Sequence, residues 1–534
     1  MKNNTSAKLD SLLFITIVLS VILFILLPFL SVFSEALFIE GQLDFSGFRK
    51  FFLEDSFLLK NSLQVGILTT VFSTIAAVLI AVYAVFFGNR KRIENILLIT
   101  MISPPFVTSL SYIELFGRRG FITHDLLGLT LNTYGMWGII LMQSIGFISI
   151  NTLLAINAIS KINNEIIYSS RDLGAHSDRI ILDIILPMIK NTIVVIAMLT
   201  FIRSLADFST PTIIGGNFST MATEAYLSMI SSGDIHYAAV LNTILFIPSL
   251  IAFSFYRKHI YAERNEGKVS GNIIKLERKG FFACITKGIS LFFLLWILLN
   301  YGAILFSAFT KRYMGTPYFT FQNFIDSSPY ITGTFLRSIL YSLIAGSLAA
   351  IIGLLIGYYL IIRKKKFMYW IDLIATIPYI IPGSFFGIGY ILAFKNPPLA
   401  LTGTAAIVVL NMLFKTLPFS SKLGTEAASE LNIDTIRSIK DLGGNHLAVI
   451  KDALFAQSKG SLFMSFANGF TASMTTIGSI IFLVYPGQKV ATLVMFDVIQ
   501  TGKYSIGAVI ATIIILLTLS INLLARKLIK GRRI

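Results

Sequence analysis

The sequence is poor in charged residues. Only 13% of its 534 residues are Asp, Glu, Lys or Arg, whereas 55% are apolar. A water-soluble chain carries roughly a quarter charged residues. The mean hydropathy is +0.77. Because so few charges cannot build a water-exposed surface of this size, lipid must cover much of the exterior, and we predict a polytopic membrane protein.

Residues that bind metals or form disulfides are also scarce. The one cysteine, Cys284, excludes an internal disulfide and a cysteine-based metal site, and the five histidines are scattered. The chain has no Gly-x-x-x-x-Gly-Lys-Ser/Thr phosphate loop. We therefore expect no catalytic residues, no metal site, no cofactor bound by this chain, and no ATP hydrolysis by the chain alone.

Apolar runs long enough to cross a bilayer recur along the whole chain. A span needs about 20 mostly apolar residues. The first run is too long for a signal-peptide core and lacks a small-residue cleavage site, so we expect it to be retained. About twelve spans are predicted, near residues 12–33, 61–87, 94–115, 134–157, 190–213, 236–256, 281–308, 336–362, 367–394, 401–420, 460–484 and 504–525.

The basic residues indicate membrane topology rather than a nucleic-acid partner. The net charge is +17, but Lys and Arg stand in short clusters between apolar runs. The main clusters, including Arg90-Lys91-Arg92, Arg363-Lys364-Lys365-Lys366 and both chain ends, fall on one side of the predicted spans. The positive-inside rule assigns that side, with both termini, to the cytoplasm.

A polar linker divides the chain into two halves. We expect an N-terminal helix with an extracytoplasmic segment (1–56), a first transmembrane domain (57–256), a basic cytoplasmic linker (257–280), a seventh helix with an extracytoplasmic segment (281–331), a second transmembrane domain (332–525) and a basic cytoplasmic tail (526–534).

The two longest cytoplasmic stretches inside the halves, near 158–189 and 421–459, carry an internal repeat. Asp172-Leu173-Gly174-Ala175 in the first matches Asp441-Leu442-Gly443-Gly444 in the second, 269 residues later. Transporters commonly form their pathway between repeated halves. We therefore predict an all-α membrane protein with two homologous six-helix halves.

Each repeat has the pattern of a short helix, a glycine and a second short helix. Glycine permits a sharp reversal between the helices, and Pro187, after Leu186, opens the next span. A short amphipathic helix outside the membrane is well shaped to sit in a groove of another protein. The alternative is an interfacial helix resting on lipid headgroups.

These loops resemble the coupling loop of type I ABC importer permeases. In that family the motif runs Glu-Ala-Ala, three residues, Gly, and then thirteen residues to a Pro that follows Leu. Gly174 and Leu186-Pro187 fit this spacing, whereas Tyr168-Ser169-Ser170 replaces Glu-Ala-Ala. In the second half Gly443 is kept, Arg437-Ser438-Ile439 replaces Glu-Ala-Ala, and Phe455-Ala456 replaces Leu-Pro.

The whole chain resembles the fused two-half permeases of the ferric-iron class, on Ser103-Pro104-Pro105-Phe106-Val107, the segment 115–120, the segment 204–216, Ile380-Ile381-Pro382-Gly383 and Leu417-Pro418. The resemblance implies a type I ABC importer fold in the bacterial cytoplasmic (inner) membrane. It also implies a partner ABC ATPase dimer that uses the ATP, an extracytoplasmic solute-binding protein, and import of ferric iron. Related permeases for aminoethylphosphonate, thiamine and polyamines share much of the pattern.

A few intramembrane residues are candidates for the pathway or for docking. Arg203 and Asp207 are spaced one helical turn apart, and charges within spans tend to be functional. The alternative is a local ion pair that ties helices together. Pro104, Pro105 and Pro382 are expected to break helices beside the pathway, or merely to kink them.

A secondary transporter is the competing interpretation. Such a protein binds its solute near mid-membrane and uses ionisable residues there for ion coupling. In this sequence the best-matched repeat lies in cytoplasmic loops instead. We therefore favour the permease of an ATP-driven importer, which is a translocation subunit and not an enzyme.

Overall fold

The computed structural model describes residues 2–101, 103–104, 107–130, 132–263, 274–278, 280–313, 316–485 and 487–530. The described part is almost entirely helical, and the only strands it contains form two short antiparallel hairpins. In the first hairpin Phe38 pairs with Leu43, and in the second Thr310 pairs with Phe319. The all-α membrane fold predicted from composition is confirmed.

The first half contains α1 (Lys2–Val21), η1 (Ile22–Leu26), α2 (Leu27–Leu37), β1 (Phe38–Ile39), β2 (Gln42–Leu43), α3 (Ser46–Lys50), η2 (Phe51–Asp55), α4 (Ser56–Val82), η3 (Tyr83–Phe87), α5 (Arg90–Thr100), α6 (Val107–Phe116), η4 (Phe121–Leu126), α7 (Met136–Ile159), α8 (Asn164–Asp172), α9 (Ser177–Arg179), η5 (Ile180–Ile185), α10 (Leu186–Met188), α11 (Lys190–Ala206), α12 (Ser209–Ile214), α13 (Met221–Ile230) and α14 (Ile235–Glu263).

The second half contains α15 (Phe281–Phe309), β3 (Thr310–Tyr313), β4 (Thr316–Phe319), α16 (Gln322–Ile331), α17 (Thr334–Gly357), η6 (Tyr358–Ile362), α18 (Lys366–Thr376), η7 (Ile377–Tyr379), α19 (Gly383–Phe394), α20 (Ala405–Ser429), α21 (Ile433–Asp441), α22 (His446–Ala448), η8 (Val449–Phe455), α23 (Lys459–Thr475), α24 (Ala491–Gln500) and α25 (Tyr504–Lys530).

Eight of these helical stretches are long and apolar enough to cross a membrane, and the number rises to ten if each of two bent pairs is one span. Ten of the twelve predicted spans fall on them. The bends measure 67° before α11 and 116° between η7 and α19. The two remaining predictions are shorter helices: 94–115 contains α5 and α6, and 460–484 begins with α23, which ends at Thr475.

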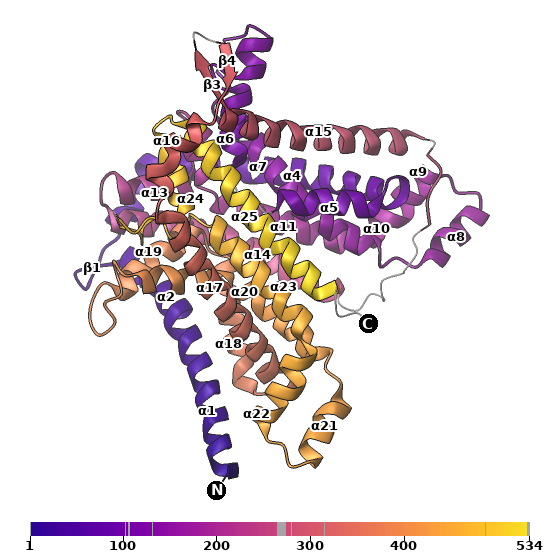
Figure 1. Cartoon of the computed structure of the whole chain (residues 1–534), viewed down its shortest axis with the longest axis vertical. Helices are drawn as coiled ribbons and strands as arrows, with labels where there is room; N and C mark the ends of the chain where they lie inside the picture. The colour runs from indigo at the N-terminus through magenta and orange to yellow at the C-terminus, as the bar shows by residue number, and fades with distance from the viewer. Residues whose placement is uncertain are drawn as a thin grey trace.

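The first long helix of each half packs against the other half. Helices α1 and α2 contact α18, α19 and α22, and α15 contacts α4, α6 and α9. Each also keeps a contact within its own half, α2 with α14 and α15 with α25. In Figure 1, α15 runs along the upper right over first-half helices, and α1 descends beside α18 and α22. We call α1–α2 and α15 the exchanged helices, because each crosses the boundary that the sequence predicts at 257–280.

Within the second half, small residues bring two spans into close contact. Gly353 and Gly357 on α17 face Gly424 on α20, and a Cβ at any of these three positions would overlap the opposite backbone. Membrane helices associate through such small-residue faces because lipid gives no hydrophobic drive between them. The first half packs α4 against α7 with Ala77 and Ala155, both fully buried.

The predicted linker and tail fall partly outside the described residues, which omit 264–273, 279 and 531–534. Residues 274–278 lie against the first half. Lys275 donates from Nζ to the carbonyls of Val85 and Gly88 at 2.7 Å, and Leu276 donates from its backbone N to Phe86 at 3.3 Å. The second half therefore begins from a segment fixed to the first.

Candidate functional site

The first cytoplasmic loop forms the predicted helix, turn and helix. Helix α8 begins where the Asn163 side chain accepts a hydrogen bond from the backbone of Glu165 at 3.0 Å. It ends at Gly174, whose φ of +82° is a conformation that favours glycine. Ala175 N donates to Ser170 O at 3.0 Å, and Gly174 N donates to Arg171 O at 2.8 Å. This pair of bonds is a Schellman motif, which satisfies the last carbonyls of the helix.

The second loop repeats this construction bond for bond. Asn432 caps the start of α21, Gly443 has φ of +79°, and Gly444 N donates to Ile439 O at 2.8 Å. Gly443 N donates to Lys440 O at 2.9 Å. The sequence match at Asp172-Leu173-Gly174 and Asp441-Leu442-Gly443 thus reflects one local structure built twice.

Each loop presents a leucine to its surroundings and buries an isoleucine. Leu173 is 88% exposed and Leu442 is 89% exposed, the two highest values among the large apolar side chains described. On the opposite face, Ile167 packs with η5 and Ile436 packs with η8. Because the two leucines stand at matched positions in the two loops, this face is a candidate surface for contact with another protein. In Figure 1, α8 lies at the right edge and α21 at the bottom.

The segment after each glycine contacts an exchanged helix. In the first loop, Asp178 on α9 accepts hydrogen bonds from the backbone N of Phe281 at 3.0 Å and of Phe282 at 3.2 Å, the first residues of α15. Ser177 donates from Oγ to Glu277 O at 3.2 Å. A carboxylate at a helix N-terminus is stabilised by the unpaired N–H groups and the helix dipole.

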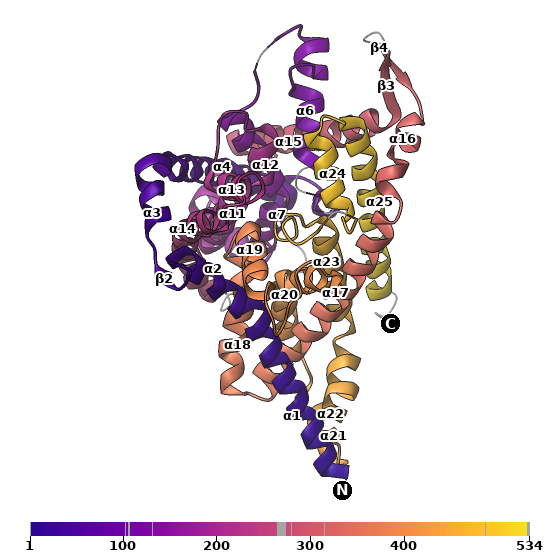
Figure 2. The ribbon, with the colours of Figure 1, turned by 90° about the vertical axis from the view of Figure 1, so that its left-hand side faces the viewer.

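In the second half the polar link between α1 and the loop is indirect, because it runs through η6 and Arg363. Asp10 on α1 forms an ion pair with Arg363 at 2.9 Å and accepts a hydrogen bond from Tyr359 Oη at 3.0 Å. The neighbouring Tyr358 donates to the carbonyl of His446 on α22 at 3.5 Å. Figure 2 shows α1 running beside α21 and α22 at the lower end of the molecule.

Leu186 and Pro187 lie in α10, one turn before α11 begins at Lys190. The chain bends by 67° between these helices. The expectation that Pro187 opens the next span therefore holds to within three residues. The second half has Phe455-Ala456 at this place, and there Ser458 is the residue that precedes the first turn of α23.

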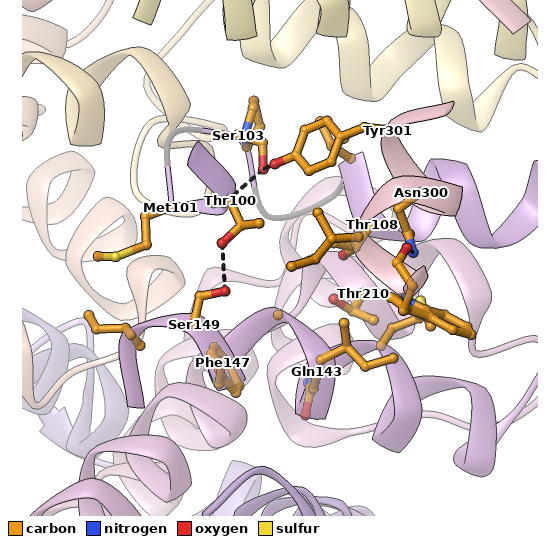
Figure 3. A pocket seen from close by; sticks show the side chains of 18 of the residues that line it. Thr100, Met101, Ser103, Thr108, Gln143, Phe147, Ser149, Thr210, Asn300 and Tyr301 are labelled. Carbon is orange, nitrogen blue, oxygen red and sulfur yellow. Dashed lines mark hydrogen bonds between the residues drawn. The ribbon is translucent and has the colours of Figure 1, made fainter. Parts of the chain in front are cut away.

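The intramembrane candidates of the first half meet in one cavity. Arg203, Asp207 and Pro104 line a space of about 230 Å³. Its walls come from the end of α5, the start of α6, α7, α11 and the exchanged helix α15. Figure 3 shows its polar side chains, among them Thr100, which donates to Ser149 Oγ at 2.5 Å, and Tyr301, which donates to Ser103 Oγ at 3.0 Å. Pro105 lies outside the described residues.

The expected ion pair between Arg203 and Asp207 does not form. The i,i+4 spacing assumed a continuous helix, but α11 ends at Ala206. The Asp207 carboxylate instead caps α12, accepting from Ser209 N at 3.0 Å and Thr210 N at 3.2 Å. Its other oxygen accepts from Gln143 Nε2 at 3.1 Å. Within the described ranges, Arg203 has no hydrogen bond or ion pair.

Pro382 stands apart from this cavity, at the 116° break that precedes α19. A residue that the sequence reasoning missed, the partly buried Lys415 of α20, bonds to backbone carbonyls at this break. Its Nζ donates to Pro378 O at 2.9 Å and Ile381 O at 3.2 Å. The sequence signal that could have identified this residue is a single lysine inside an apolar run. At the same 269-residue offset the first half has Gly146, which lines the cavity.

Among the described residues, no group of three or more His, Cys, Asp or Glu side chains is placed to hold a metal ion. The other intramembrane acids have local partners. Ser307 donates to Glu114 Oε1 at 2.8 Å, and Lys489 pairs with Asp497.

Comparisons with known proteins agree with this architecture. Residues 74–263 match the family described as "binding-protein-dependent transport system inner membrane component". The chain is 27% identical to the ferric transport system permease protein of Actinobacillus pleuropneumoniae, over 87% of this chain and 70% of the relative.

A second relative, named as a ferric transport system permease of Haemophilus influenzae, is 26% identical over 89% of this chain and 78% of its own length. A protein of Salmonella typhi named as a 2-aminoethylphosphonate transport system permease is 22% identical over 45% of this chain and 93% of its own length. Matches that span nearly the whole chain, together with one that spans a single half, fit two permease units joined end to end. These similarities support a fused ABC importer permease in which both halves lie in one polypeptide.

Proposed function

We propose that this chain forms the membrane pathway through which an ATP-driven importer carries ferric iron into a bacterial cell. The observation that carries the proposal is the pair of matched loops, each with a Schellman turn at glycine and a leucine almost fully exposed. A dimeric ATPase has two equivalent docking grooves, and two loops of one design suit it. ATP hydrolysis belongs to that partner.

In this proposal α8 and α21 are the docking helices, and both lie on the cytoplasmic side. The residues 172–175 and 441–444 fix the turn, and Leu186 and Pro187 lead from the first loop into α11. The basic clusters place both termini on the same side. A solute-binding protein would then meet the opposite face, where the hairpins β1–β2 and β3–β4 lie.

Ferric iron is favoured over other solutes because the two relatives that match almost the whole chain are named as ferric transport permeases. Aminoethylphosphonate, thiamine and polyamines remain the alternative solutes of the same class. Arg203 faces the cavity of the first half and is free to contact a passing solute. A guanidinium repels a bare trivalent cation, so the iron would have to pass as a complex with anionic ligands.

The docking loops are tested by replacing the exposed leucines. Burying a leucine side chain contributes about 1.5–3 kcal/mol, so Leu173→Ser and Leu442→Ser should each weaken association with the ATPase by roughly ten-fold or more. Leu129→Ser, at a residue 41% exposed on the opposite face, is the matched control and should bind normally. The measurement is binding of the purified ATPase to each variant in nanodiscs.

If the double variant Leu173→Ser/Leu442→Ser binds the ATPase as tightly as the unaltered chain, these loops are not docking elements and the proposal fails. The solute is tested separately, by uptake of radiolabelled ferric iron and of 2-aminoethylphosphonate in cells that express the whole transporter. Uptake of only the phosphonate would reject iron and leave the importer mechanism intact.

A further inference from the structure

A large groove opens on the face opposite the docking loops, away from the cavity around Arg203. Its volume is about 930 Å³, and its walls come from the end of α6, the end of α15, α16 and the start of α25. These helices converge near the top of Figure 1, below the β3–β4 hairpin. The groove has an apolar floor and a basic rim, which are described in turn.

The floor is formed by the outward face of α15. Leu298 is 69% exposed and Phe306 is 47% exposed, and both continue a row of exposed apolar residues along this span. Between them lies Gly302, where an added Cβ would meet nothing within 4 Å. Because α15 crosses the membrane, this floor faces the hydrocarbon of the outer leaflet and offers room for an acyl chain.

The rim carries four basic side chains: Arg118, Arg119, Lys311 and Lys503. Arg118 and Arg119 are exposed, and neither has a hydrogen bond or ion pair within the part of the chain that the structure describes. Basic residues are depleted on this side of membrane proteins, so adjacent arginines there need a reason.

The other two basic groups have partners in the structure. Lys311 is paired with Asp326 at 2.6 Å, and Lys503 donates to Tyr330 Oη at 2.7 Å. The remaining carboxylate of the lining, Glu114, accepts a hydrogen bond from Ser307. Four positive charges against two carboxylates leave the rim positive.

Aromatic residues indicate the depth of the groove in the membrane. Tyr134 and Tyr504 also line the groove. Tyrosine is enriched at the level of the lipid headgroups, where its ring is apolar and its hydroxyl is wet. Two tyrosines in the lining are therefore consistent with a groove at the level of the lipid headgroups.

We propose that this groove binds an anionic phospholipid of the outer leaflet, with an acyl chain on Leu298, Gly302 and Phe306 and the headgroup phosphate between Arg118 and Arg119. Guanidinium groups bind phosphate oxygens through paired, charge-assisted hydrogen bonds. An acidic surface of a soluble protein could meet the arginines but could not cover the apolar floor. The lipid satisfies both parts of the groove.

The test is native mass spectrometry of the delipidated full chain, titrated with phosphatidylglycerol and, separately, with phosphatidylcholine. A basic residue near anionic lipid contributes about a fivefold change in affinity. We therefore expect Arg118→Gln and Arg119→Gln each to weaken phosphatidylglycerol binding about fivefold, and Gly302→Leu to weaken both lipids by filling the floor. Lys395→Gln, an exposed lysine on the same side but outside the groove, should change nothing.

Three results would overturn the proposal. The first is equal affinity for the two lipids, and the second is unchanged phosphatidylglycerol affinity in the Arg118→Gln/Arg119→Gln variant. The third is displacement of phosphatidylglycerol by millimolar glycerol phosphate, which would mean that the rim binds a soluble anion and the floor contributes nothing. Within the second result, loss of binding to the solute-binding protein in the same variant would identify the groove as a protein contact.

Discussion

The glycine at each docking turn can be tested by a pair of substitutions that differ in backbone preference. At Gly174 and Gly443 an added Cβ would meet nothing within 4 Å, so side-chain size costs nothing there. What remains is the positive φ, +82° and +79°. Asparagine adopts this conformation readily, whereas a β-branched residue does so rarely.

The expected magnitude follows from that difference. An L-residue in the left-handed region costs roughly 1–2 kcal/mol, and valine should lie at the upper end. A change of about 2 kcal/mol corresponds to roughly a 30-fold increase in the open form of the turn. For Gly174→Asn the increase should be only a few-fold, because the Schellman bonds to Ser170 and Arg171 are retained.

The assay is hydrogen–deuterium exchange of the peptide that covers 163–189, in the complete chain in nanodiscs. Gly174→Val should speed exchange at Ala175 by roughly 30-fold if the opening equilibrium is rapid, and should weaken ATPase association. The peptide covering 432–458 serves as an internal reference and should be unchanged. Gly443→Val should speed exchange in the peptide 432–458 and leave the peptide 163–189 unchanged. If valine and asparagine behave alike at both sites, the backbone conformation does not control the loops and the reasoning is wrong.

Three further predictions concern the membrane architecture. Gly424→Ala should destabilise the protein by about 1–3 kcal/mol, because the added Cβ would overpack against α17. Gly460→Ala, at a helical position with open space around it, should be neutral or stabilising. Thermal unfolding of both variants measures the difference. In a Cys284→Ser background, a cysteine at Lys440 should be labelled only from the cytoplasm and one at Lys395 only from outside; reversed labelling would invert the topology. One copy of this chain should be found for each pair of ATPases in the mass of the purified complex, and two copies would contradict a complete pathway in one chain.

The sequence predicted those features that depend on neighbouring residues. The helix, glycine and helix around Gly174 follow from local patterns, since glycine terminates helices and the apolar face of α8 recurs at helical spacing. The eight continuous spans follow from apolar runs. Where Asp207 was expected to continue a helix, it caps the next one, because a carboxylate competes for free backbone N–H groups at a helix start.

Features set by distant residues could not be predicted in this way. The ammonium of Lys415 finds its partners 34 and 37 residues earlier in the chain, at a break whose depth no local pattern reveals. The exchange of α15 between halves is another such feature. Nothing in the apolar run 281–309 indicates that it packs on α4 and α6 of the first half as well as on α25 of its own half.

The exchanged helices also connect the two docking loops to the opposite halves. Asp178 lies four residues after Gly174 and holds the first turn of α15, the helix that opens the second half. On the other side, Asp10 of α1 reaches the α22 region through Arg363 and the adjacent tyrosines. The first link is a direct helix cap, whereas the second runs from α1 through residues 358–363 to α22. A displacement of either loop is therefore expected to move a helix that belongs in sequence to the other half.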